Sequence, residues 1–338
     1  MKPSTAPVRA RAELATRRGP GAAPAAGRGR SADSPVEVPK AGWRDILWRT
    51  YKQLGEDNLS IVAAGVAFFA FLAIVPAMAS GIALYALVAD PNQIASHLDA
   101  LGRVIPAETT ALLREQLTRL ATNEPAAGWG AALGLALTLF SSLKGTKALM
   151  LGLNIAYDEE EQRGVVKLHL IALALTLAGI IGAAVLVSLV AFIPAFVDLV
   201  QLPTAVETAI SWTRWPLVAA MFMIGLAVLY RYGPSRDRPR WRWVSWGAAA
   251  GALLWLAGSA AFSLYVSSFG NYDKTYGSLG AVVVFLLWLN LSAYSILFGA
   301  ELNTETERQT AKDTTEGPQA PIGHRGAYAA DTVGPSKQ

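Results

Sequence analysis

Long apolar runs without charged residues constrain this chain most strongly. They recur between Leu59 and Leu302, and several reach the length of about 20 residues that a helix needs to cross a hydrocarbon core of roughly 30 Å. Of 338 residues, 53% are hydrophobic and only 16% are charged, whereas about a quarter of the residues in a soluble domain are charged. We therefore predict an all-α, polytopic membrane protein.

The apolar runs predict a bundle of six transmembrane helices within residues 41–303. Residues 1–40 and 304–338 are polar or rich in Pro and Gly, and we expect both to be disordered tails. Short amphipathic helices are expected around Trp43 to Tyr51 and within the connection 90–127. Pro76 is expected to kink the first span. The predicted spans are about 59–89, 128–157, 168–197, 216–232, 244–267 and 279–302.

The basic residues predict how the bundle lies in the membrane. The N-terminal region, the 2–3 and 4–5 connections and the C-terminal tail together hold 24 of the 29 Lys and Arg residues, and the other three connections hold five. Basic residues concentrate on the cytoplasmic side of membrane proteins. We therefore expect both termini in the cytoplasm and the protein in the plasma (inner) membrane. The same rule explains the positive net charge without nucleic acid as a partner.

A polar stripe follows the inner half of span two. Lys144, Lys147 and Asn154 lie on it, and a lysine at the bilayer centre costs at least about 2.5 kcal/mol. These side chains must therefore face other helices, a wet cavity or lipid headgroups. Two interpretations stay open: the lysines line a polar cavity, or they extend to the inner interface and bind lipid phosphate.

Span six carries Asn290 and closes with Glu301 and Asn303. Glu301 is the one acidic residue adjoining that apolar run, and Lys144 or Lys147 is a possible partner for it. The alternative is an interfacial carboxylate in water.

The segment before span six predicts either a helix cap or a gate. Gly277 permits a tight re-entry, and Asp273 is placed to cap the amides of the span, which contributes about 1 kcal/mol. In the alternative, Tyr272 and Tyr276 gate an outer entrance, with Asp273 meeting a basic residue. We favour the cap.

Small residues on span five predict close helix packing. Gly247 and Gly251 form a GxxxG motif, and Gly258 follows two turns later. Such glycines let helix backbones approach one another. We assign them no chemical role.

Several kinds of chemistry have no motif in this sequence. There is no cysteine, HExxH, GxSxG or GxxxxGK[ST] sequence. The acidic residues at 158–161 are contiguous, so on a helix they point in different directions and at most two of them could converge on a metal. We therefore expect no enzyme, no metal and no cofactor.

Four segments resemble the BrkB/YihY family of bacterial inner-membrane proteins, which has also carried the name ribonuclease BN. They are DNLSIVAAGVAFFAFLAIVPA (57–77), LKGTKALMLGLNIAYDEEEQRG (143–164), YDKTYGSLGAVVVFLLWL (272–289) and LFGAELN (297–303). The resemblance implies a six-span bundle in the plasma membrane, with proposed roles in envelope integrity, serum resistance and transport.

These observations favour transport or lipid translocation, with a polar cavity between spans two, five and six. The lysines would neutralise an anionic lipid or a small anion there. The competing hypothesis is a structural or accessory protein that offers its outer helices and the GxxxG face to a partner complex. A membrane-associated hydrolase is a third and weaker hypothesis. The oligomeric state does not follow from the sequence.

Overall fold

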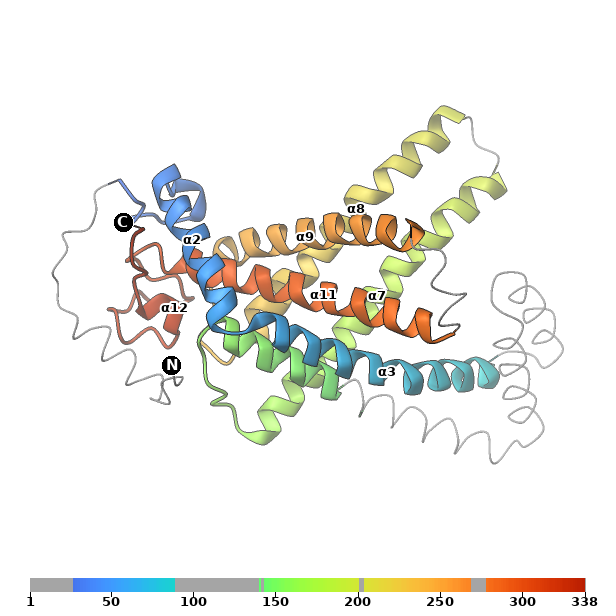
Figure 1. Cartoon of the computed structure of the whole chain (residues 1–338), viewed down its shortest axis with the longest axis horizontal. Helices are drawn as coiled ribbons and strands as arrows, with labels where there is room; N and C mark the ends of the chain where they lie inside the picture. The colour runs from blue at the N-terminus through green and yellow to red at the C-terminus, as the bar shows by residue number, and fades with distance from the viewer. Residues whose placement is uncertain (1–26, 89–139, 141–142, 201–203, 269–277, 338) are drawn as a thin grey trace. The chain divides into compact units, whose positions relative to one another are not determined.

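The computed structural model describes residues 27–88, 140, 143–200, 204–268 and 278–337 (Figure 1). The chain divides into two compact units, one formed by Met1–Ala67 with Lys147–Gln338 and the other by Phe68–Thr146. The described residues form helices, and the one β feature among them is an isolated bridge between Pro239 and Thr315. The all-α prediction is confirmed.

Residues 143–156 are helical, apart from the named elements. The named helices are η1 (Pro35–Glu37), α2 (Lys40–Glu56), α3 (Leu59–Val88), α7 (Val165–Val200), α8 (Thr204–Tyr232), α9 (Trp241–Ser268), α11 (Ser278–Glu307) and α12 (Tyr328–Asp331).

Three segments of the described helices are long and apolar enough to cross a bilayer: Val165–Gly182, Trp241–Val266 and Val282–Glu307. A fourth exists if Lys40–Glu56 and Leu59–Ala73, inclined at 64°, form one broken span, and Pro216–Tyr232 is a shorter apolar helix. Lipid-facing side chains such as Leu253 and Leu264 are about two-thirds exposed. The protein is therefore a membrane protein. The count of six spans stays a prediction, because much of span two lies outside the described residues.

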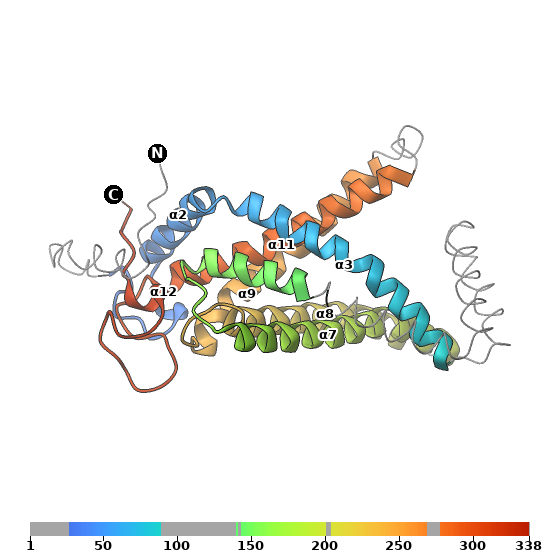
Figure 2. The same cartoon turned by 90° about the horizontal axis from the view of Figure 1, so that it is seen from below.

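The glycines of α9 pack against α11, as predicted. A Cβ added to Gly247 would overlap the Gly299 carbonyl, and one added to Gly251 would lie 3.0 Å from the Ser295 carbonyl oxygen. Gly258 faces Leu291 in the same way. Figures 1 and 2 show the two helices side by side. The GxxxG face is therefore covered within the chain, and our hypothesis that it is free for a partner is wrong.

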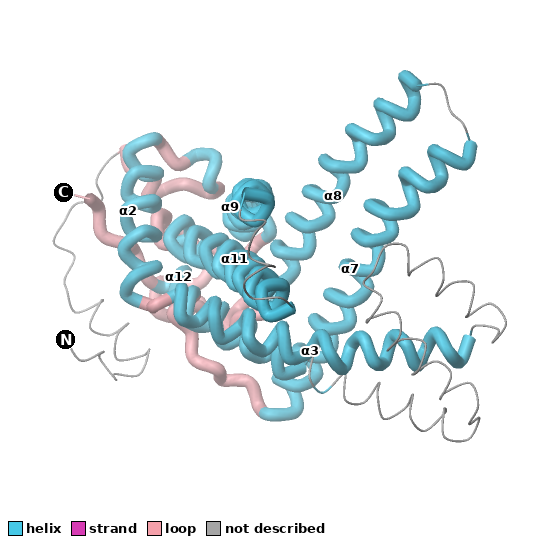
Figure 3. Tube along the Cα trace, turned by 45° about the vertical axis from the view of Figure 1, so that its right-hand side comes forward, coloured by secondary structure: helices cyan, strands magenta, loops and turns pink. Residues whose placement is uncertain are grey.

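α7 and α8 form a helical pair that joins the core through α9 (Figure 3). α8 continues through Pro216 without ending. The C-terminal half of α8 contributes to a core that it shares with α3, residues 147–157, α9 and α11. The fully buried members of this core include Leu59, Leu153, Tyr157, Leu226, Tyr230, Val244 and Leu297.

The basic segments gather at one end of the larger unit. Hydrogen bonds link them: Asn154 contacts Ser235, Arg236 contacts Glu307, and Glu159 contacts Tyr328. We call this end the polar cap. It comprises residues 27–58, 157–164, 233–240 and 308–337.

Residues 27–40 and 308–337 differ from the disordered tails that we expected. Arg30 donates to the Gly334 carbonyl over 2.5 Å, Arg49 to that of Pro335 over 2.9 Å, and Arg325 to that of Ala330 over 2.7 Å. Composition alone predicts disorder because these segments hold few apolar residues. Here arginines satisfy their backbone carbonyls instead.

Candidate functional site

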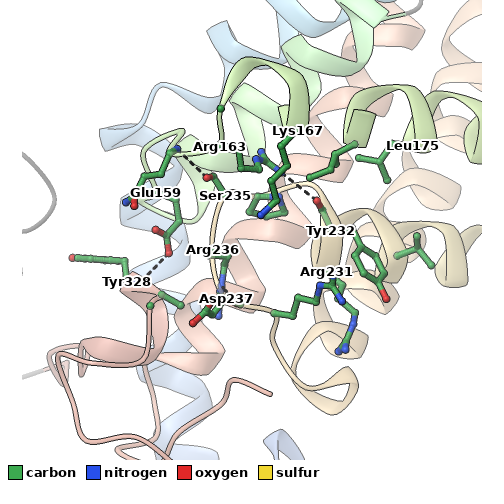
Figure 4. A pocket seen from close by; sticks show the side chains of 18 of the residues that line it. Glu159, Arg163, Lys167, Leu175, Arg231, Tyr232, Ser235, Arg236, Asp237 and Tyr328 are labelled. Atoms are coloured by element: carbon green, nitrogen blue, oxygen red, sulfur yellow. Dashed lines mark hydrogen bonds between the residues drawn. The ribbon is translucent and has the colours of Figure 1, made fainter. Parts of the chain in front are cut away.

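A cavity of about 950 Å³ opens where the polar cap meets α7 and α8 (Figure 4). Its wall comes from the start of α7, the end of α8, the loop that follows α8 and the C-terminal segment. Five basic and three acidic side chains line it, so basic charge is in excess. They are Arg163, Lys167, Arg231, Arg236 and Arg238, and Glu159, Asp237 and Asp331.

Three of the lining arginines are engaged within the protein. Arg163 pairs with Glu161 at 2.6 Å, Arg231 with Glu316 at 2.5 Å, and Arg236 with Glu307 at 2.7 Å. Although burial opposes it, the Arg163 hydrogen bonds lower the pKa of Glu161 to about 2. Burial likewise opposes the charge of Arg236, yet Glu307 raises its pKa. These arginines build the wall.

Lys167 and Arg238 are different. In the part of the chain that the structure describes, neither forms an ion pair, and Arg238 lies 4.9 Å from the centre of the Tyr232 ring. Figure 4 shows Lys167 among Arg163, Ser235 and Tyr232. Two cations that face a cavity without a paired acid favour an anionic ligand.

The cavity continues between α7 and α8 as an apolar wall. On α7, Lys167, Ile171, Ala174 and Ala178 follow one another at intervals of four, three and four residues, so they share one helix face. Val228 of α8 lies opposite. Eleven residues of helix rise about 16 Å, close to half of a hydrocarbon core of roughly 30 Å. The wall therefore has a charged end and an apolar end one leaflet deep.

Glu159 joins the C-terminal segment to the cavity. Its carboxylate accepts a hydrogen bond of 2.7 Å from the Tyr328 N–H. Burial raises the pKa of Glu159 to about 7, although Arg236 opposes this effect. The charge on this wall of the cavity therefore changes near neutral pH.

Lys147 contacts a histidine and not Glu301. Lys144 is exposed, with its Nζ atom 4.6 Å from the centre of the Phe140 ring. Lys147 donates to Nε2 of His169 over 2.7 Å, and His169 in turn contacts the Val165 carbonyl through Nδ1. The cavity that we describe is lined by neither lysine, and lies between α7 and α8 instead of between spans two, five and six.

The predicted asparagines hold segments together. Asn154 accepts from the Ser235 N–H over 2.8 Å and donates to Glu161 over 3.2 Å. Asn303 accepts from the Gly247 N–H over 2.7 Å and donates to the Val244 carbonyl over 3.2 Å. Both side chains are buried, and Asn290 is half-buried. These contacts give Asn154 and Asn303 a structural role.

The predicted gating residues remain untested by the structure. Tyr272, Asp273, Tyr276 and Gly277 lie outside the described residues. Pro76 falls within α3, which runs as one helix from Leu59 to Val88.

The acidic run after residue 157 diverges, but residues 158–161 lie in a turn and a loop and not on a helix as expected. Glu159 contacts Tyr328, Glu161 contacts Arg163, and Glu160 is exposed. Among the described residues, no three His, Cys, Asp or Glu side chains are placed to hold a metal ion.

Sequence reasoning missed the cavity itself. From the sequence alone, the arginines at 231–242 indicate only orientation, and Lys167 counts only as one basic residue of the 2–3 connection. One feature of the sequence could have identified Lys167. It lies on the same helical face as Ile171, Ala174 and Ala178, so a basic residue stands at the N-terminal end of an apolar stripe.

Comparison with known proteins decides the family. The family model described as "Virulence factor BrkB" matches residues 50–323. The chain belongs to the BrkB family. The resemblance carried by the four sequence segments is thereby confirmed.

Relatives of this BrkB-family protein cover most of its length. "Putative ribonuclease-like protein YfkH" of Bacillus subtilis is 31% identical over 248 residues, which are 71% of this chain and 87% of the relative. "UPF0761 membrane protein IL2447" of Idiomarina loihiensis is 24% identical over 286 residues, 78% of this chain and 95% of the relative. No solved structure matches.

Proposed function

We propose that this BrkB-family protein binds an anionic phospholipid from the inner leaflet of the plasma membrane and supports its translocation. The observation that carries the proposal is the two-ended cavity, with unpaired Lys167 and Arg238 at one end and the α7 stripe at the other. A phospholipid has the same division, a phosphate and acyl chains. A small anion would use only the charged end.

The orientation in this proposal rests on the basic residues. The cap segments hold 14 of the 29 Lys and Arg residues of the chain, and such basic segments favour the cytoplasmic side. The cavity would then open at the level of the inner headgroups, where anionic lipids concentrate. Control of anionic lipid between leaflets would contribute to envelope integrity.

Lipid retention tests the binding step. The protein is extracted in native bilayer discs, and its bound lipids are quantified by mass spectrometry. Each basic residue near an anionic surface contributes about 1 kcal/mol. The double variant Lys167→Ala/Arg238→Ala should therefore lower the affinity for phosphatidylglycerol roughly 30-fold. Lys52→Ala/Lys312→Ala is the matched control, because it removes two exposed charges of the cap that already pair with Glu56 and Asp33.

Two outcomes would contradict the proposal. Equal retention of anionic lipid by the two double variants would show that the cavity does not hold it. Stabilisation by inorganic phosphate alone, without effect of phosphatidylglycerol vesicles, would identify a small-anion site. Translocation is measured separately, as the rate at which fluorescent phosphatidylglycerol changes leaflets in proteoliposomes. This rate should fall in Lys167→Ala/Arg238→Ala and persist in the control.

A further inference from the structure

Glu301 is a buried carboxyl group that the structure leaves without a partner. It lies near the end of α11 and is 0% exposed. Within the described residues, neither of its oxygen atoms accepts a hydrogen bond. One turn earlier, Leu297 occupies the same helix face and lies beside Val62 and Gly152. Glu301 is therefore enclosed by protein at the base of the core.

The surroundings of Glu301 are mostly acidic. The described charges that act on it are those of Glu305 and Arg308 on its own chain segment, Asp57 between α2 and α3, and Asp158 after residues 147–157. Arg308 is the one cation among them. An ionised carboxylate that is buried without a hydrogen bond or a paired cation is strongly unfavourable. A protonated, neutral carboxyl group costs less free energy to bury.

Arg308 is already held elsewhere. Its Nη1 atom donates to Glu305 over 2.5 Å, and Glu305 also forms an ion pair with Arg49 of α2. The Arg308 Nε–H is buried and, among the described residues, without an acceptor. Residues 301 and 305 lie on one face of α11, and Arg308, the first residue after the helix, continues that face because its N–H donates to the Thr304 carbonyl over 3.0 Å. A spare donor and a spare acceptor thus share that face.

We propose that Glu301 is a proton-binding site, and that release of its proton transfers Arg308 from Glu305 to Glu301. In the described arrangement Glu301 carries the proton, while Arg49 and Arg308 share Glu305. On release the O–H bond of the carboxyl group breaks and the proton passes to water. The Arg308 guanidinium then donates to the new carboxylate, and Arg49 alone holds Glu305. Each acid is left with one arginine.

The exchange reaches the cavity through Tyr328. The Arg308 guanidinium lies 5.3 Å from the Tyr328 ring, and the Tyr328 N–H contacts Glu159 in the cavity wall. Movement of Arg308 would alter that wall. This last link rests on the proposed function, whereas the proton site does not.

Infrared spectroscopy tests the proton site directly, because a protonated carboxyl group and a carboxylate absorb differently. The full chain is measured in lipid discs at a pH well above the pKa of about 7 of Glu159. Wild type should show a carboxylic acid signal equal to one group, and Glu301→Gln should lack it. Glu160→Gln, which changes an exposed residue of the same type, should retain it.

Three results would overturn the proposal. Identical signals from wild type and Glu301→Gln would show that Glu301 is ionised. If Glu301→Gln does not fold, absence of the signal in wild type has the same meaning. A signal that appears only when sodium is replaced by choline would identify a metal-cation site. Arg308→Gln tests the exchange: the pH at which the signal disappears should rise by at least about one unit, and an unchanged pH would refute it.

Discussion

Arg49 of α2 and Glu305 of α11 form a buried ion pair across 256 positions of sequence. Their side chains are 4% and 1% exposed. Arg49 also donates to the Glu305 carbonyl and to Gln309, each over 2.9 Å. One arginine therefore joins α2 to the end of α11.

Loss of one partner of this pair should be strongly destabilising. Glu305→Gln leaves Arg49 buried without its counter-charge, which costs about 3–5 kcal/mol. Arg49→Gln should cost a similar amount. The apparent unfolding temperature, followed by size-exclusion fluorescence in detergent, measures both. In Arg49→Met/Glu305→Leu no charge of this pair remains, so this variant should lose less than the two single changes combined. Additive losses would show that the pair is not coupled.

The pH dependence of stability should contain a contribution from Glu159. Its folded-state pKa of about 7 exceeds the unfolded value of 4.5, so the folded state binds more protons than the unfolded state between these values. Stability from this group is fully present below the unfolded pKa and is lost as the pH rises through the folded pKa. Glu159→Gln should flatten the decrease in unfolding temperature over this interval. Glu160→Gln should leave the decrease as in wild type.

The α9–α11 contact predicts that Gly247 and Gly299 tolerate an added methyl group much less well than Gly225 of α8 does. Gly299→Ala and Gly247→Ala each place a methyl group onto backbone or Tyr230, and such overpacking costs about 1–3 kcal/mol or more. Gly225 of α8 has nothing within 4 Å of an added Cβ, so Gly225→Ala should be neutral or stabilising by up to about 1 kcal/mol. Unfolding temperatures in one detergent measure all three. A larger loss for Gly225→Ala would contradict the packing.

Substitution of the two asparagines of α11, Asn290 and Asn303, should lower the unfolding temperature by different amounts. Asn303→Leu removes the acceptor of the Gly247 N–H and places an apolar group beside the Val244 carbonyl. Leaving buried polar groups unsatisfied costs about 1–3 kcal/mol. Asn290 is half-buried, and Asn290→Leu should change stability by less than about 0.5 kcal/mol. If Asn303→Leu were equally mild, the two hydrogen bonds of Asn303 would contribute little to stability.

Sequence predicted the membrane-spanning character because hydrophobicity acts locally. A run such as 282–300 can only be a buried or lipid-facing helix. The glycines at 247 and 251 likewise indicate close packing, because small residues in a membrane helix let a neighbouring backbone approach. Their partner, α11, could not be inferred from the motif. That failure produced our incorrect view of an open face.

The cavity and the ordered C-terminal segment could not be predicted for a related reason. Lys167 and Arg238 line one cavity only because α7 and α8 lie side by side, and no local pattern encodes that arrangement. Residues 308–337 hold few apolar groups, yet Arg30, Arg49 and Arg325 provide donors for their carbonyls. The order of this segment depends on residues far away in sequence. The expected contact between Lys147 and Glu301 is absent for the same kind of reason, since helical rotation and depth decide such a contact.

The separation of Arg49 from its partners has a consequence for biosynthesis. Ribosomes add roughly 5–20 residues per second, so Arg49 emerges on the order of ten to fifty seconds before Glu305. During that interval the arginine must stay hydrated or be held by a chaperone or the insertion machinery. A chain truncated before residue 305 would keep it in that state permanently. Completion of the cap therefore depends on translation having passed the end of α11, where Glu305 lies.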